Sequence, residues 1–221
     1  MSNEFNELST SERWHRLVGA AIQAIKSDGH ELARQPGRGR SNVWKMRGKG
    51  GEQLVSIRTT RDRWIAFPPM KGGWKTLDDV EVVVVAAVDD ADDPKNAEVY
   101  MFPADDVRER FTQSYKARTG AGQAVRDNFG MWVCLDLEDR GIPSSVGSGL
   151  VDHYEPIAVY PLSELEPSDE VRRANTDYSQ DARPVDEPRT IADVLSHASV
   201  AIAHIAGVAP EKVKLDLKIE S

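Results

Sequence analysis

The stretch Val80-Glu-Val-Val-Val-Val-Ala-Ala-Val88 decides the fold, because it is the longest apolar run in a chain of 221 residues. A nearly unbroken run of Val and Ala of this length is typical of a strand that is buried on both faces. It is much shorter than the ~20 apolar residues that a membrane span needs. We therefore expect a central strand here, with further layers of structure on both sides of it.

Shorter elements are expected before and after this strand. Before it, the sequence predicts strands at 42–46, 52–60 and 63–67, connected by a turn at 47–51 and by the pair Arg61-Asp62. Residues 54–60 alternate between more and less apolar side chains, which is typical of a strand. After it, we expect a strand at 98–102, a helix from Pro103 toward Arg118, a short helix at 123–128, and strands at 131–137 and 157–160.

Helices are also expected near both ends of the chain. Ser9-x-x-Glu12 is a capping box, and an apolar stripe follows it at helical spacing until Asp28-Gly29. Residues 167–189 are polar and lack periodicity, as in a linker or an extended arm, and residues 190–221 resemble a small helix-strand unit. We therefore predict an α/β (α+β) fold whose main domain, 1–166, is a mixed sheet flanked by helices.

Charge is distributed unevenly along the chain. Residues 1–77 hold 14 Lys and Arg against 7 Asp and Glu, whereas residues 78–221 hold 14 against 29. The formal net charge of −8 therefore conceals a basic first third and an acidic remainder. Such an asymmetry indicates an anionic partner for the basic part, or docking of the two parts on each other.

The cysteine content and the N-terminal residues bear on the compartment. Cys134 is the single cysteine, which excludes an internal disulfide and favours a reducing environment. It lies in the apolar run 131–135, where a buried, inert thiol is a simpler interpretation than a nucleophile. The first residues lack the basic and apolar regions of a signal peptide. We therefore expect a cytoplasmic protein.

Positive charge is concentrated at residues 31–75, where 11 Lys and Arg stand against three acidic residues and aromatic residues are interleaved. Arg and Lys neutralise phosphates, and aromatic side chains stack on exposed bases. Tryptophans in the core and charges on solvated loops would give the same composition, so that alternative stays open. The residues predicted to contact nucleic acid are Arg38, Arg40, Trp44, Arg47, Lys49, Arg58, Arg61, Arg63 and Trp64.

The order of elements resembles the restriction-endonuclease-like fold, also called PD-(D/E)xK, over roughly residues 10–120. The segment Glu52-Gln-Leu-Val-Ser-Ile-Arg-Thr-Thr60 resembles the central strand of that family, and the strand at 82–88 and the run 99–107 into a helix follow in the same order. The resemblance implies an acidic residue, any residue and a lysine on the central strand. The acids of the family hold a divalent metal, and the lysine stabilises charge at the scissile phosphate.

This catalytic motif is not intact here. Ser56-Ile57-Arg58 stands where the family has acid-x-Lys. Serine is not a hard anionic ligand for Mg²⁺, and arginine is not equivalent to lysine. Glu52 lies about 13 Å from Ser56 along an extended strand, too far to share one metal ion. The five histidines show no zinc-binding spacing. We therefore expect no catalytic residue, no metal and no cofactor.

Three functions remain open. The leading expectation is a non-catalytic nucleic-acid-binding protein of bacterial or phage type, built on a nuclease-like scaffold. The first alternative is a protein–protein interaction or inhibitor module that acts through its acidic second part, at 89–93 and 164–170. The second is a metal-dependent nuclease with migrated ligands. The expected partners are nucleic acid or a protein but no membrane, and a homodimer paired through a strand at 214–220 is also open.

Overall fold

The computed structural model describes residues 4–35, 43–127 and 130–167 of the chain. The chain divides into two compact units, Met1–Arg172 and Arg173–Ser221, and the described residues all belong to the first. The predicted linker at 167–189 lies outside the described residues apart from Pro167, and so does the whole helix-strand unit predicted at 190–221. Within the described ranges, no helix is long and apolar enough to cross a membrane.

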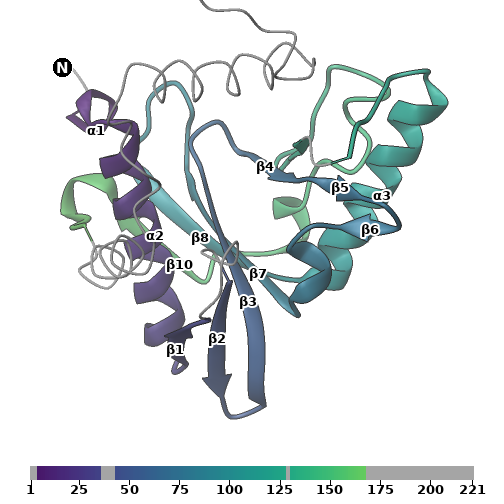
Figure 1. Ribbon diagram of the computed structural model, residues 1–221. Coiled ribbons are helices and arrows are strands. Elements are labelled where there is room, and N and C mark those ends of the chain that lie inside the picture. Colours follow the sequence, from purple (N-terminus) through teal and green to yellow (C-terminus); the bar gives the residue numbers. More distant parts are fainter. Residues whose placement is uncertain (1–3, 36–42, 128–129, 168–221) are drawn as a thin grey trace, which may run out of the picture. The chain divides into compact units, whose positions relative to one another are not determined.

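The described part of the first unit is organised around one mixed sheet of six strands, with helices on its two faces (Figure 1). This confirms the predicted α+β fold with a mixed, helix-flanked sheet. β3 and β7 are parallel, and the other neighbouring strands are antiparallel. In their order across the sheet, the strands are β1 (Glu31–Arg34), β2 (Val43–Gly48), β3 (Gly51–Thr60), β7 (Val82–Val88), β8 (Asn96–Pro103) and β10 (Ala158–Pro161).

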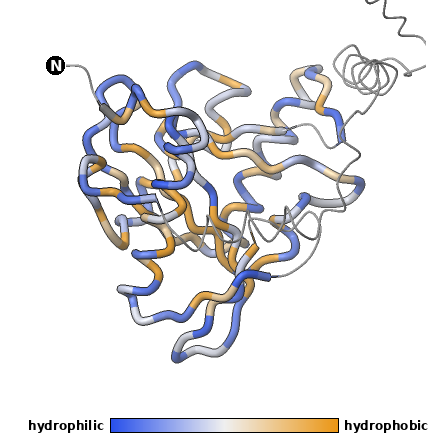
Figure 2. The backbone as a smooth tube through the Cα atoms, turned by 60° about the vertical axis from the view of Figure 1, so that its left-hand side comes forward, coloured by the Kyte–Doolittle hydropathy of each residue, from blue (hydrophilic) through white to orange (hydrophobic). Residues whose placement is uncertain are grey.

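β7 is the buried strand that the Val/Ala run predicts. It lies in the interior of the sheet between β3 and β8, and all seven of its side chains are buried. Val82, Val84, Ala86 and Val88 belong to one core cluster, and the residues between them belong to the other. The run is apolar throughout because both of its faces support a core, as Figure 2 shows by the hydrophobic colour of the inner strands.

Helix α2 (Thr10–Ser27) covers one face of the sheet, preceded by the short helix α1 (Glu4–Glu7). Its start is the predicted capping box: the backbone N–H of Glu12 donates to Ser9 Oγ at 3.2 Å, and the N–H of Ser9 donates to Glu12 Oε2 at 3.0 Å. Its apolar stripe packs against β3, β7 and β8 and forms the first core cluster. The helix ends at Ser27 with Asp28 as its C-cap, and Gly29 follows with a φ of 85°.

Helix α3 (Ala104–Gly120) belongs to the core cluster on the other face of the sheet. That cluster also contains the two-stranded ribbon of β4 (Trp64–Phe67) and β9 (Met131–Cys134). Phe111 of the helix makes edge-to-face contacts with Phe67 and Trp74, at centroid distances of 5.3 Å each. The ribbon therefore has one face buried against the core.

Some elements differ from the prediction. The short helix expected at 123–128 does not form over the described residues 123–127, because α3 ends at Gly120 and Gly122 turns the chain with a φ of 79°. The strand expected at 131–137 stops at Cys134. Strand β1 and the small hairpin of β5 (Pro69–Met70) and β6 (Gly73–Trp74) were not predicted, since none of them has an apolar alternation long enough to detect.

Candidate functional site

The first part of the candidate site is the face of β3 that carries Ser56, Arg58 and Thr60. These residues alternate with Val55 and Ile57, which point into the core cluster beneath α2. The side chain of Ser56 is fully buried, and its Oγ has no hydrogen-bond partner among the described residues. Ser56 and Arg58 therefore share the face of β3 that is turned toward α3 and the ribbon.

Arg58 is a partly buried cation without an acidic partner in the described part of the chain. Its Cζ lies 4.3 Å from the ring centroid of Phe67, which makes a cation–π contact, and its Nε has no hydrogen-bond partner there. Burial lowers the pKa of the guanidinium to about 10, so the group stays charged at neutral pH. A charge withdrawn from water and left unpaired is unfavourable, and an anion that reached it would relieve that cost.

Within the described ranges, no cluster of metal-binding side chains accompanies this face. Among the residues that the structure describes, no three His, Cys, Asp or Glu side chains are placed to hold a metal ion. Glu52 accepts a hydrogen bond from Lys45 at 2.8 Å and from Arg47 at 3.0 Å. These two ion pairs occupy its carboxylate at the hairpin end of β3.

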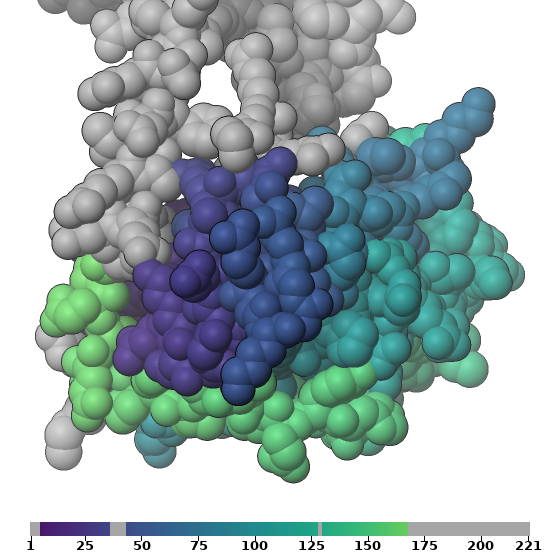
Figure 3. Space-filling model, turned by 90° about the horizontal axis from the view of Figure 1, so that it is seen from below, coloured from purple at the N-terminus to yellow at the C-terminus, as the bar shows by residue number. Residues whose placement is uncertain are grey.

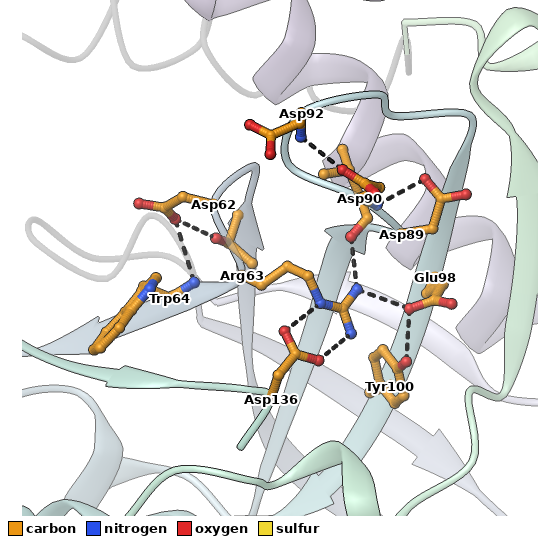
Figure 4. Close-up of polar contacts among 11 residues, drawn as sticks. Asp62, Arg63, Trp64, Asp89, Asp90, Asp92, Glu98, Tyr100 and Asp136 are labelled. Carbon is orange, nitrogen blue, oxygen red and sulfur yellow. Dashed lines mark hydrogen bonds and ion pairs between the residues drawn. The ribbon is translucent and has the colours of Figure 1, made fainter. Parts of the chain in front are cut away.

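Arg63 makes contacts entirely within the protein (Figure 4). Its guanidinium donates to both carboxylate oxygens of Asp136, at 2.6 and 2.9 Å, to Glu98 at 2.8 Å and to the carbonyl of Val88 at 2.6 Å. Burial disfavours its charge, but the hydrogen bonds to Asp136 and Glu98 outweigh burial and raise its pKa. Arg63 therefore joins the ends of β4, β7, β8 and β9 instead of facing a ligand.

The hydroxyl of Tyr100 extends this network by donating to Glu98 at 2.7 Å. Burial, and then that hydrogen bond, raises the pKa of Tyr100 to about 12. The folded state therefore holds the phenolic proton more tightly than the unfolded state, whose pKa is about 10. The resulting stability is fully present below about pH 10 and is lost as the pH rises through about 12.

We therefore expect the free energy of unfolding to fall more steeply between about pH 10 and 12 in the wild type than in Tyr100→Phe. Urea unfolding at a series of pH values, followed by circular dichroism, measures both slopes. The other tyrosines and the lysines titrate equally in both proteins, so the difference isolates Tyr100. Equal slopes would show that the network does not hold this proton.

The remaining predicted residues lie in different places. Trp44 is 6% exposed and packs in the core beneath α2. Arg47 and Lys49 are exposed at the hairpin between β2 and β3, which points toward the viewer in Figure 3. Arg61 is exposed at the opposite end of β3, about 30 Å away along an extended strand of ten residues. Arg38 and Arg40 lie outside the described residues.

Arg61 and Trp64 thus lie at the turn between β3 and β4, and Arg58 lies on β3 just before that turn, against Phe67 on the inner side of β4. Asp62 stabilises this turn, because one of its oxygens accepts from Thr60 Oγ1 at 2.8 Å and from the backbone N–H of Trp64 at 3.2 Å (Figure 4). Arg140 stacks on Trp64, with 4.7 Å from its Cζ to the ring centroid. We call these residues, Arg58, Arg61, Trp64 and Arg140, the turn cluster.

Trp132 is a residue that sequence reasoning missed. It is 50% exposed on β9, although its neighbours in the run 131–135 are buried. The alternation of Ile65 and Phe67 on β4 was a signal that one face of this strand is buried. Met131 and Val133 alternate in the same way on β9, and this alternation would have placed Trp132 on the outward face of that strand. Cys134, as expected, is a buried free thiol, and burial raises its pKa.

The acidic loop 89–95 is stabilised by its own carboxylates. Asp89 accepts from the backbone N–H groups of Asp90 and Lys95, each at 2.9 Å, and Asp90 accepts from those of Asp92 and Asp93. The hydrogen bonds from the backbone N–H groups of Asp93 and then Asp92 lower the pKa of Asp90. The loop therefore needs no ligand to explain its aspartates.

No family model, curated protein or solved structure matches this chain.

Proposed function

We propose that this protein binds nucleic acid without cutting it, and that phosphate groups meet the turn cluster at the end of β3. The scaffold we propose is a nuclease-like one, in which Ser56-Ile57-Arg58 replaces the acid-x-Lys motif on the central strand. Positive charge is retained at the place where the family stabilises a phosphate, and the acidic ligand is lost. A single reduced cysteine fits our further proposal of a cytoplasmic location.

The observation that supports the proposal is the lack of an ion-pair partner for Arg58 among the described residues. Its guanidinium is partly buried over Phe67 and makes no ion pair within the described residues, whereas Arg63, Lys45 and Arg47 all have carboxylate partners. A planar guanidinium presents a fork of donors that matches phosphate oxygens. Arg61, exposed at the adjacent turn, would supply a second phosphate contact.

Arg58→Met separates a binding role from a structural one. We expect affinity for a DNA or RNA oligonucleotide to fall about tenfold and the salt dependence of binding to weaken by about one ion. We expect stability to be unchanged or slightly raised, because an unpaired buried cation is replaced by an apolar side chain of similar length. Fluorescence anisotropy across a salt series and urea unfolding measure the two quantities.

Arg47→Met is the matched control, since Arg47 lies at the other end of β3 and is already paired with Glu52. It should leave affinity within about twofold of the wild type, as expected for a surface ion pair. If the wild-type protein binds neither DNA nor RNA at low salt, the proposed function is wrong. If Arg58→Met and Arg47→Met bind alike, the turn cluster is not the phosphate site.

A further inference from the structure

The ribbon of β4 and β9 has an outward face that phosphate binding at Arg58 does not use. In the register of the two strands, Trp64 lies opposite Cys134 and Ala66 lies opposite Trp132. These four residues alternate with Ile65, Phe67, Met131 and Val133, which belong to the core cluster beneath the ribbon. Trp64 and Trp132 therefore point to the same side, away from the core.

The two tryptophans are diagonal neighbours on this face. Residues at such positions of an antiparallel pair are about 7–8 Å apart, within reach of large aromatic side chains. Trp132 is 50% exposed, and Trp64 is partly buried beneath the guanidinium of Arg140. The face therefore presents two indole rings on a rigid support, with alanine and cysteine as the small side chains between them.

An arginine side chain contacts each tryptophan, one at its ring and one at its backbone. Arg140 stacks on Trp64 and also donates to Glu138 at 2.5 Å. Arg118, from the last turn of α3, donates to the carbonyl of Trp132 at 3.2 Å. Arg61 lies in the turn that leads into β4. The face thus combines flat aromatic surfaces with guanidinium groups that attract a phosphate chain.

We propose that this face binds single-stranded nucleic acid, with one base stacked on Trp132 and the next placed against Trp64 and Arg140. This inference rests on the proposed function and narrows its ligand to a single strand. In a duplex the bases are stacked on one another about 3.4 Å apart, so their faces are not available to a protein. Diagonal positions of an antiparallel pair, about 7–8 Å apart along the backbone, suit successive bases of an extended, unstacked strand.

The connection between the two sites is the turn between β3 and β4. Arg58 contacts Phe67 on the inner side of β4, and Trp64 lies on the outer side of the same strand. A strand whose bases stack on the ribbon would cross the turn at Arg61 to bring a phosphate toward Arg58. Sequence preference is expected to be weak, because stacking on an aromatic ring accepts any base.

The test compares Trp132→Ala with Leu137→Ala by fluorescence anisotropy, on a labelled oligothymidylate of about 15 nucleotides and on a hairpin duplex. Leu137 is a matched control because it is an apolar side chain on the same segment of chain and is 75% exposed. We expect Trp132→Ala to weaken single-strand binding about tenfold, and Leu137→Ala and Trp132→Phe to change it less than threefold.

The outcomes separate this inference from the proposed function. Binding of the single strand that depends on Trp132, with quenching of tryptophan fluorescence, supports both. Equal or tighter binding of the duplex, or binding unaffected by Trp132→Ala, overturns the single-strand inference and leaves the proposed function standing. Binding of neither oligonucleotide by the wild type overturns both.

Discussion

Arg63→Ala is expected to lower the free energy of unfolding by about 3 kcal/mol, because removing one partner of a buried ion pair leaves the other charges uncompensated. The guanidinium joins Glu98, Asp136 and the carbonyl of Val88, and its side chain is only 11% exposed. The carboxylate of Asp136 is 42% exposed, so water will compensate part of the loss. Urea unfolding monitored by circular dichroism gives the value.

Two further variants make this prediction specific. Arg63 has a φ of 59°, a conformation that glycine adopts without strain, so Arg63→Gly should be about 1 kcal/mol more stable than Arg63→Ala. Arg61→Ala, two residues away and exposed, should change stability by less than about 0.5 kcal/mol. If Arg63→Ala is as stable as Arg61→Ala, the network contributes nothing and the structural assignment of Arg63 is wrong.

Gly147→Ala is expected to destabilise the protein by a similar amount, about 3 kcal/mol, for a steric reason. Gly147 has a φ of 88°, and a Cβ there would clash with the backbone carbonyl of Arg110 in α3. The same helix residue donates to the carbonyl of Ser148 at 2.6 Å, which anchors the loop 141–149 to α3. Either the loop or the helix must move to accept the methyl group.

Gly141→Ala is the control for the clash. Gly141 has a similar φ of 81°, but a Cβ at this position meets nothing within 4 Å. It should therefore cost only the backbone strain, about 1 kcal/mol. The difference between the two melting curves in the same buffer isolates the contact with Arg110. Similar losses in both variants would show that the loop is not held closely against the helix.

Most of the described sheet was predictable because its strongest signals are local. Three of these signals each lie within a single helix or strand: the capping box at Ser9 and Glu12, the Val/Ala run and the alternation in β3. Each is confirmed in the structure. The pairing of β4 with β9 could not be predicted, because these two four-residue strands lie far apart in the sequence and pair only in the folded chain. Short strands of this kind carry little pattern of their own.

The candidate site was less predictable, because a count of positive charges does not reveal their partners. Arg63 and Asp136 lie 73 positions apart in sequence, so no local sequence pattern predicts their ion pair. Trp44 is a second example. Its place in a basic stretch of sequence predicted stacking on bases, but in the structure it lies opposite Val55 in the sheet and belongs to the core. Arg58 remains a candidate phosphate contact because no carboxylate forms an ion pair with it in the described part of the chain.

The pairing of β4 with β9 also has a consequence for how the protein acquires its outward aromatic face. The ribbon joins segments separated by β7, β8 and α3, so its two tryptophans meet only after the long chain between them has folded. Closing such a loop costs conformational entropy before any contact is gained, and contacts of this range slow folding. We therefore expect that neither half of the chain, synthesised alone, would display the face, and that its appearance would mark completion of the fold.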